Sequence, residues 1–398
     1  MKFLTVILLT TLSHAETVSQ PSTAPVTREE LIKWVRAEYA KSPAEWPAPT
    51  LDEGVIHQEL GIPGPIPSPP DNEPTPDNKK LGLALFFDPR LSGSQQISCS
   101  RCHDPEKAWA DGRSQATGVF MEALPRNTPS LAGVGHAKSL MWDGRFQTLE
   151  RQAIDVIVNP KEMAGNPQEI VARLTAEKDF YGPMFHAAFG DPEIIFERVV
   201  KALASFQRGL RVGNSRFDRF LSGKHDALKD DELVGLHLFR TQARCINCHN
   251  GPMLSDYQFH NDGLTYYGRR FEDFGLYAVT KKPEDMGKFR TPPLRNVGHT
   301  DPWMHNGLFT DLRGILNLYN AGMPQPKRKD HQKEDSLFPI TSRLLKPLKL
   351  DKQQLADLEA FLHTLDERPS RMLRQPFPPL QAQPAPNRVL VPAAGGNP

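Results

Sequence analysis

Net charge, apolar residues and cysteine are all scarce in this chain of 398 residues. Lys and Arg total 48 against 47 for Asp and Glu, so no overall field favours a nucleic acid or an anionic membrane surface as partner. Only 38% of the residues are hydrophobic and 37 are proline, which argues against an all-helical bundle with short turns. The chain is long enough to bury a hydrophobic core without disulfide or metal cross-links. Its four cysteines form two pairs of close neighbours in sequence, which is a poor disulfide framework. Something other than regular secondary structure must organise the loops.

The one long apolar run lies at the N-terminus, over Phe3–Leu12, and small residues follow it at Ser13 and Ala15. This pattern predicts a secretory signal peptide over residues 1–15, cleaved after Ala15. An uncleaved anchor is the alternative, but a transmembrane helix needs about 20 apolar residues and no second candidate follows. We therefore expect an exported, periplasmic protein with no membrane span in its mature form.

Proline content and helical periodicity divide the rest of the chain. Residues 16–78 form a Pro-rich N-terminal extension, in which Thr27 and Glu30 predict a capping box at the start of a helix. The rest of the extension is expected either to wrap around a domain or to be disordered. The remaining segments are a first compact unit (79–213), a second compact unit (214–367) and a Pro-rich tail (368–398).

Apolar residues recur at helical spacing in both units, and no strand pattern is strong enough to predict a main sheet. Asp77 is the expected cap of the first helix of unit one, and Asn166 caps another, with Pro167 in its first turn. A helix over residues 196–210 is expected to link the two halves. The second unit is expected to contain two further helices, one that starts at residue 230 and runs into the second cysteine pair, and one over residues 350–365. The expected fold is therefore mainly α, with long irregular loops.

The two cysteine pairs share one pattern, Cys-x-x-Cys-His. The first copy is Cys99, Cys102 and His103, and the second is Cys245, Cys248 and His249. A zinc ribbon places its two cysteine pairs about 15 to 20 residues apart, which is far less than the separation of Cys102 and Cys245 in this chain. A redox dithiol appears once, in a strand–helix setting, and gives no reason for the histidine.

A c-type haem requires all three residues at once, because two thiols add to the haem vinyl groups and the adjacent histidine reaches the iron. Two matches that use every cysteine of an exported chain predict two covalently bound haem c groups, with zinc or disulfides as alternatives. The apolar surface of each haem supplies part of a small core. The expected architecture is two cytochrome c-like haem domains with long irregular loops.

Further motifs follow in a fixed order along the chain. They are “LALFFDPRLSG”, “AWADGR”, “LPRNTPSL”, “MWDGR”, “NPKEM”, “FDRFLSG”, “FHNDGL”, “KFRTPPLRNVGHTDPWMHNG” and “LYNAG”. Together with both haem motifs, this order resembles the bacterial di-haem cytochrome c peroxidase and MauG family, over roughly residues 79–365. The resemblance implies that hydrogen peroxide reacts at the haem of the N-terminal unit, while the haem of the C-terminal unit relays electrons.

The resemblance also assigns roles beside the haems. Trp142 of “MWDGR” matches a tryptophan that lies between the two haems and can pass an electron or a hole. Glu162 of “NPKEM” matches the distal carboxylate, which can move a proton from one peroxide oxygen to the other. The alternatives are a core aromatic for Trp142 and a solvated loop residue for Glu162.

Calcium between the domains is a further family feature. The matching positions here are Asn127, Thr300 and Pro302, although a turn residue is the alternative for Asn127. Arg126 and Arg295 are of the right residue type to pair with haem propionates, with surface solvation as the alternative.

The peroxide haem departs from the pattern of many family members, which rest with a histidine on its iron. The matching residue here is Val119, which cannot ligate iron. Met121 and His136 are nearby but do not stand at the matching position. The resemblance therefore implies a peroxide haem that is open at rest.

The relay haem departs as well. Many peroxidases place a methionine on its iron, whereas Tyr319 stands at the matching spacing from His305, as in MauG-like members. A tyrosine ligand favours the ferric and higher states. The alternative is that Tyr319 packs in the core and Met323 reaches the iron.

Together these features predict an exported di-haem peroxidase with a MauG-like ligand set. A small redox protein, a cytochrome c or a cupredoxin, is the expected electron donor, and the chain allows a homodimer. One alternative is a MauG-type oxidase that modifies a partner protein, but the surface tryptophan of MauG before the second haem motif is Ala243 here. A di-haem electron-transfer cytochrome with no open iron is the alternative from another class.

Overall fold

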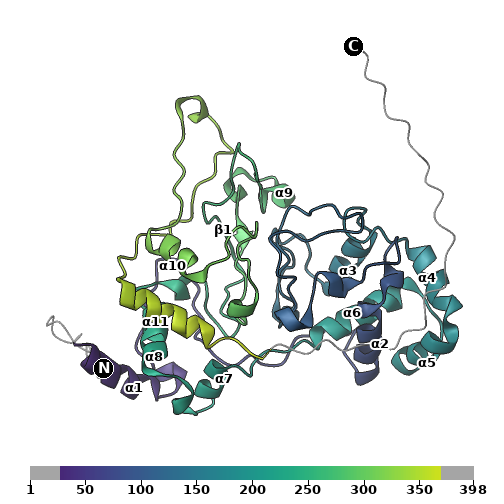
Figure 1. The fold of residues 1–398 in the computed structure, drawn as a ribbon, viewed down its shortest axis with the longest axis horizontal. Helices are drawn as coiled ribbons and strands as arrows, with labels where there is room; N and C mark the ends of the chain where they lie inside the picture. The colour runs from purple at the N-terminus through teal and green to yellow at the C-terminus, as the bar shows by residue number, and fades with distance from the viewer. Residues whose placement is uncertain (1–26, 369–398) are drawn as a thin grey trace, which may run out of the picture.

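The computed structural model describes residues 27–368, which form two helical lobes side by side (Figure 1). The expected signal peptide and almost all of the Pro-rich tail lie outside these residues. The helices are α1 (Arg28–Tyr39), α2 (Pro76–Phe87), α3 (Leu149–Val158), α4 (Pro167–Ala176), α5 (Lys178–Phe189), α6 (Phe196–Arg208), α7 (Arg216–Leu221), α8 (Asp230–Arg240), α9 (Tyr277–Thr280), α10 (Leu312–Asn320) and α11 (Lys352–His363). Two short strands, β1 (Phe259–His260) and β2 (Phe289–Arg290), pair antiparallel.

The mainly α fold is confirmed, since this two-residue strand pair is the only sheet within residues 27–368. Helices α2 to α6 build the first lobe, and α8, α10 and α11 lie in the second (Figure 1). No helix of the described chain has both the length and the apolarity needed to cross a bilayer.

Each lobe is built on a helix pair that crosses at a glycine. A Cβ atom added to Gly82 of α2 would lie 2.0 Å from the carbonyl oxygen of Ala202 in α6. A Cβ atom on Gly235 of α8 would lie 2.0 Å from the carbonyl oxygen of Asp357 in α11. The local sequences, “GLALF” and “GLHLF”, are nearly the same. The two lobes therefore repeat one contact in which only glycine lets the helix backbones approach so closely.

The apolar positions expected from helical spacing are buried in two separate cores. The first core includes Leu81, Leu85, Phe86, Val199, Val200, Leu203 and Phe206, and the second includes Leu355, Leu358, Phe361, Leu362 and Leu365. The helix over residues 196–210 was expected to link the halves. As α6 it packs on α2 and α3 inside the first lobe instead, because its apolar face is needed to close that core.

The helix caps follow the sequence signals with one correction. Thr27 and Glu30 form the predicted capping box, and the Asn166 side chain accepts hydrogen bonds from two backbone N–H groups at the start of α4. The prediction of Asp77 as the cap of α2 is wrong. Thr75 takes that role, since its hydroxyl accepts from Asn78 N at 3.1 Å and the intervening proline suits the first helical position.

The N-terminal extension wraps around both lobes, which is one of its two expected states. Helix α1 packs on α8, with Val35 and Tyr39 buried in the second core. Further along, Gly61 accepts a hydrogen bond from Arg295 of the second lobe through its carbonyl oxygen. Asn72 donates to Glu150 of the first lobe at 2.6 Å. The extension therefore ties the two lobes together.

The glycine contacts generate a stability prediction. Gly82→Ala and Gly235→Ala should each lower the free energy of unfolding by about 1 to 3 kcal/mol, because the added methyl overpacks a closed helix crossing. The measurement is urea unfolding of the haem-loaded protein. Gly64→Ala is the matched control, since no atom lies within 4 Å of its added Cβ. Core glycine variants as stable as this control would contradict the packing argument.

Candidate functional site

The two Cys-x-x-Cys-His segments adopt the same local structure. Each begins with a 3-10 turn, at Cys99–Arg101 and at Cys245–Asn247. The N–H of His103 donates to the Cys99 carbonyl at 3.0 Å, and that of His249 to the Cys245 carbonyl at 2.8 Å. This turn brings the histidine back beside the first cysteine in both lobes, as attachment to one planar group requires.

Both motif histidines are held in the tautomer that binds a metal. His103 Nδ1 lies 3.0 Å from the carbonyl oxygen of Trp109, and His249 Nδ1 lies 3.0 Å from that of Leu254. A carbonyl only accepts, so Nδ1 carries the proton in both rings and Nε2 keeps a free lone pair. Burial lowers the pKa of both imidazoles and keeps them neutral. Such a backbone partner on the remote nitrogen is the usual support of a metal-ligating histidine.

The four cysteines are free thiols in hydrophobic surroundings. Burial raises the pKa of Cys99 and Cys245 to about 12 each, and that of Cys102 to about 11. A redox dithiol needs a lowered pKa, so these thiols are unsuited to disulfide exchange. They fit residues that are covalently capped in the finished protein.

A cavity of about 550 Å³ lies in the first lobe, within the size range of cofactor pockets. Cys99, Cys102 and His103 line it together with Trp142 and Glu162. Its wall is largely apolar, and His103 is its only histidine among the described residues. The donor set and the apolar wall fit a c-type haem held by Cys99, Cys102 and His103.

Glu162 reaches this cavity from the turn after α3. Its carboxylate accepts a hydrogen bond from Asn159 Nδ2 at 3.1 Å, and its carbonyl oxygen accepts from the N–H of Val119 at 2.8 Å. Burial raises the pKa of Glu162 to about 6, and nearby Asp155 adds to the rise while Arg145 opposes it. A carboxyl group that titrates so close to neutrality can both take and return a proton. Val119 itself is not among the residues that line the cavity.

A second cavity of about 250 Å³ lies in the other lobe, and Cys245, Cys248, His249 and Tyr319 line it. Burial, with help from Asp262 and the motif cysteines, raises the pKa of Tyr319 far above its ordinary value. Tyr319 lies on α10 and faces the cavity, whereas Met323 is buried but is not among the described residues of the wall.

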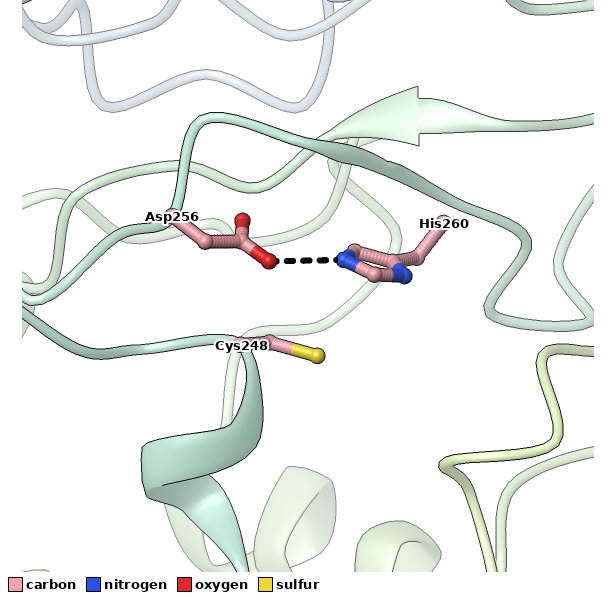
Figure 2. Close-up of side chains that lie close together, drawn as sticks. All are labelled: Cys248, Asp256 and His260. Carbon is pink, nitrogen blue, oxygen red and sulfur yellow. Dashed lines mark hydrogen bonds and ion pairs between the residues drawn. The ribbon is translucent and has the colours of Figure 1, made fainter. Parts of the chain in front are cut away.

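Asp256 and His260 form a polar cluster beside Cys248 (Figure 2). Asp256 Oδ2 lies 2.8 Å from His260 Nε2, and the possible ligand atoms of all three residues lie within 4.8 Å of one another. Burial lowers the pKa of His260, but its hydrogen bonds to Asp256 and Cys248 outweigh burial and raise the pKa to about 10. Because Cys248 belongs to the haem motif, we interpret this cluster as part of the second haem pocket.

Trp142 stands in a wall that the two cavities share. Its indole N–H donates to the Asn127 carbonyl at 2.9 Å, and its own carbonyl accepts from the N–H of Arg290 at 2.9 Å. The Asn127 N–H in turn donates to the carbonyl of His305 at 2.8 Å, and the His305 ring lies 6.4 Å from the indole. Trp142 therefore lies between the two cavities, and its role between two haems stays a prediction.

His305 was noted in the sequence only as a marker of spacing. It is stacked on Phe289 with ring centroids 3.6 Å apart, and neither ring nitrogen has a partner among the described residues. Burial lowers its pKa to about 3, so the imidazole is neutral. Sequence reasoning also missed Asp256, which pairs with His260, and the cavity residues His260 and Arg290. The motifs “FHNDGL” and “KFRTPP” contained the signal for the last two, without any indication of their roles.

The residues expected to bind calcium, Asn127, Thr300 and Pro302, all lie in the wall of the second cavity. The Asn127 side chain donates to the Arg113 carbonyl at 2.8 Å, which leaves its Oδ1 atom free to bind a cation. The calcium site stays a prediction.

The two arginines expected to meet haem propionates have protein partners instead. Arg126 forms ion pairs with Asp273 and Asp143, and Arg295 pairs with Asp218. These carboxylates already neutralise both guanidinium groups.

Comparison with known proteins agrees with this site. A family model described as di-haem cytochrome c peroxidase matches residues 76–226. Methylamine utilization protein MauG of Methylorubrum extorquens is 37% identical over 82% of this chain and 89% of its own length. Cytochrome-c peroxidase IdrP1 of Pseudomonas sp. strain SCT is 33% identical over 83% and 91%. A crystal structure of a MauG-like protein associated with microbial copper homeostasis shares the fold, with a TM-score of 0.70, 33% identity, and coverage of 80% of this chain and 96% of that one. The chain therefore belongs to the di-haem cytochrome c peroxidase and MauG family, whose members carry haem c.

Proposed function

We propose that this chain is an exported, periplasmic di-haem c-type peroxidase. It reduces hydrogen peroxide at an open haem in the unit of residues 79–213, and the haem of residues 214–367 relays electrons to it. The observation that carries the proposal is the difference between two otherwise matched cavities. Both have the same cysteine turn and oriented imidazole, and each has a carboxyl group whose pKa burial raises to about 6, Glu162 in the first and Asp262 in the second. The described wall of the first cavity has no tyrosine and no second histidine beside Glu162, whereas the second adds Tyr319, His260 and His305.

The haem iron, when bound, supplies the redox chemistry of peroxide cleavage. His103 is oriented to hold that iron from one side through Nε2. Glu162 takes a proton from one peroxide oxygen and delivers it to the other, so that water can leave. The apolar wall excludes bulk water, which strengthens this proton transfer. Trp142, in the wall shared with the second cavity, lies on the path for electrons between the sites.

The second cavity provides the relay. His249 and Tyr319 are the proposed ligands of its iron, and calcium at Asn127, Thr300 and Pro302 would fix the loop between the sites. A small redox protein, a cytochrome c or a cupredoxin, is the proposed electron donor.

A MauG-type oxidation of a partner protein is the second candidate. The 37% identity to a MauG protein and the position of Tyr319 in the cavity wall favour it. Ala243 stands where MauG has its surface tryptophan. A route for oxidising equivalents through that side chain to a partner protein is therefore missing here. A purely electron-transferring cytochrome would need a second protein ligand in the first cavity, where His103 is the only histidine of the described wall and Met141 and Met163 are the side chains that could take that position.

Haem attachment is the first prediction of this proposal. The intact mass of the mature protein under denaturing conditions should exceed the chain mass by two haems, since each motif offers both thiols. Cys245→Ser should weaken attachment at the second site and leave the first intact. A mass with one haem or none in the wild-type protein would contradict the proposal at its root.

Reaction with peroxide is the second prediction. The fully oxidised protein should react with peroxide without prior reduction, because Val119 offers no ligand that must be displaced. Glu162→Gln should keep both haems and slow this step by about 10²-fold or more, the usual scale for loss of a general acid–base group. Stopped-flow absorbance at the two haems is the measurement. Glu122→Gln, an exposed change in the same loop as Val119, is the matched control and should react at the wild-type rate.

The same experiment has a pH dependence with a definite sign. Burial raises the pKa of Glu162 to about 6, so its carboxyl becomes protonated as the pH falls through that value. The rate should therefore fall below about pH 6 in the wild-type protein, and Glu162→Gln should lose this inflection. An oxidised protein that ignores peroxide until it is half-reduced would overturn the open-site argument.

The ligand of the relay haem is the third prediction. Tyr319→Phe should leave both haems attached but change the spectrum of the second haem, and its potential should rise because an anionic oxygen no longer stabilises the ferric state. Met323→Leu, the matched control on the alternative residue, should change neither. Potentiometric titration with absorbance detection measures both variants. The reverse pattern, with an effect only in Met323→Leu, would assign a methionine ligand.

A further inference from the structure

Charged side chains that line the two cavities are almost all neutralised within the protein. Arg126 and Arg145 pair with Asp143, Arg244 and Lys346 with Asp52, Arg295 with Asp218, and His260 with Asp256. Arg290 differs from all of them. It lines both cavities, yet it forms no ion pair with any carboxylate of residues 27–368.

Arg290 is nevertheless buried, with only 6% of its surface exposed. Its Nε atom donates to the Met141 carbonyl at 3.3 Å, and Nη1 donates to the Thr291 carbonyl at 3.4 Å. The Nη2 atom has no hydrogen-bond partner in the described part of the chain. The guanidinium also lies 5.6 Å from the centre of the Tyr257 ring. Long bonds to neutral carbonyls and one aromatic contact leave the charge without an anion.

A buried charge is retained in proteins when it is paired, because desolvation otherwise costs several kcal/mol. Burial lowers the pKa of Arg290, as expected for a cation that no anion stabilises here. The strand pair and the hydrogen bond to Trp142 hold this residue firmly in the shared wall. The missing anion should therefore come from whatever fills the cavities, and each haem carries two propionate carboxylates.

We propose that Arg290, and not Arg126 or Arg295, is the cation that receives a haem propionate in the wall between the two cavities, and that its charge raises the reduction potential of both haems. This inference rests on the proposed function only in requiring that both haems are attached. The planar guanidinium offers its free Nη2 edge to the carboxylate. Arg290 is a positioning and tuning residue, because it touches the cofactor rather than peroxide.

Arg290→Gln tests the proposal through the potentials of the haem-loaded, full-length protein. A nearby positive charge stabilises the reduced state, so its removal should lower the equilibrium constant for reduction of each haem by about tenfold, which is about 59 mV for one electron. Arg290→Lys keeps the charge, so both potentials should stay close to their wild-type values. Arg244→Gln is the control in the second cavity alone, and it should leave the first haem unchanged.

A shift of both haems in Arg290→Gln that is absent from Arg290→Lys supports the proposal. A shift of neither haem, of one haem only, or of equal size in the lysine variant overturns it. Should the glutamine variant fail to fold, a crystal structure of the wild-type protein with both haems decides. A propionate oxygen within about 3.2 Å of Nη2 supports the assignment, and propionates that all point elsewhere overturn it. A wild-type chain without two haems fails the proposed function, whereas two haems with unmoved potentials fail only this inference.

Discussion

A main-chain hydrogen bond across the lobe boundary, from the Arg290 N–H to the Trp142 carbonyl, fixes the wall on which both cavities depend. The indole N–H donates to Asn127, and the N–H of Asn127 donates to His305. Loops from both lobes therefore hold the Trp142 indole. They do so through buried groups that would lose their hydrogen-bond partners if the lobes moved apart. Leaving a buried hydrogen-bonding group without its partner costs about 1 to 3 kcal/mol. These contacts therefore oppose any sliding of one lobe past the other at this point. The separation of the two sites is thus set by main-chain contacts and not by the haems alone.

The two lobes share a scaffold and differ in the polar groups that loops add to it. Gly82 and Gly235 make the same helix crossing, and both motif histidines donate Nδ1–H to a carbonyl a few residues downstream. The turn after α3 adds Glu162 to the first cavity, and α10 adds Tyr319 to the second. An ionisable carboxyl suits proton transfer, whereas a phenol suits ligation, so one scaffold supports two different roles. The division of roles that we propose therefore depends on the loops and on α10, outside the repeated helix pair.

Local patterns predicted local features well. The capping residues Thr27 and Asn166 and the apolar face of α11 depend on neighbours a few positions away, and all are confirmed. Thr75 and Asp77 are both suitable helix caps, and they lie two residues apart. Thr75 is the cap because α2 begins at Pro76, and the local sequence alone does not fix that start. Contacts between distant segments could not be predicted in this way. Gly82 meets Ala202 across more than a hundred residues, and nothing in the local sequence indicates that partner.

The cavity residues show the same limit. The motif spacing pointed to both cysteine turns and the resemblance pointed to Trp142 and Glu162, and all of these residues line the two cavities. Arg126, Arg290 and Arg295 are one residue type and all lie within family motifs, so type and motif alone could not separate them. Only the positions of Asp143, Asp218 and Asp273 reveal which guanidinium lacks an anion.

The extension completes the second lobe even though the family match begins at residue 76. Arg240 ends α8 just before the second cysteine motif and is 1% exposed in its side chain. Its partners come from the extension: Glu59 forms an ion pair with it, Tyr39 accepts a hydrogen bond at 3.1 Å, and the Trp46 ring lies 5.2 Å away. Leaving such a buried charge without its partner costs about 3 to 5 kcal/mol. The Pro-rich extension therefore supports the second cavity, since it holds the C-terminal end of α8, which is followed directly by the second cysteine turn.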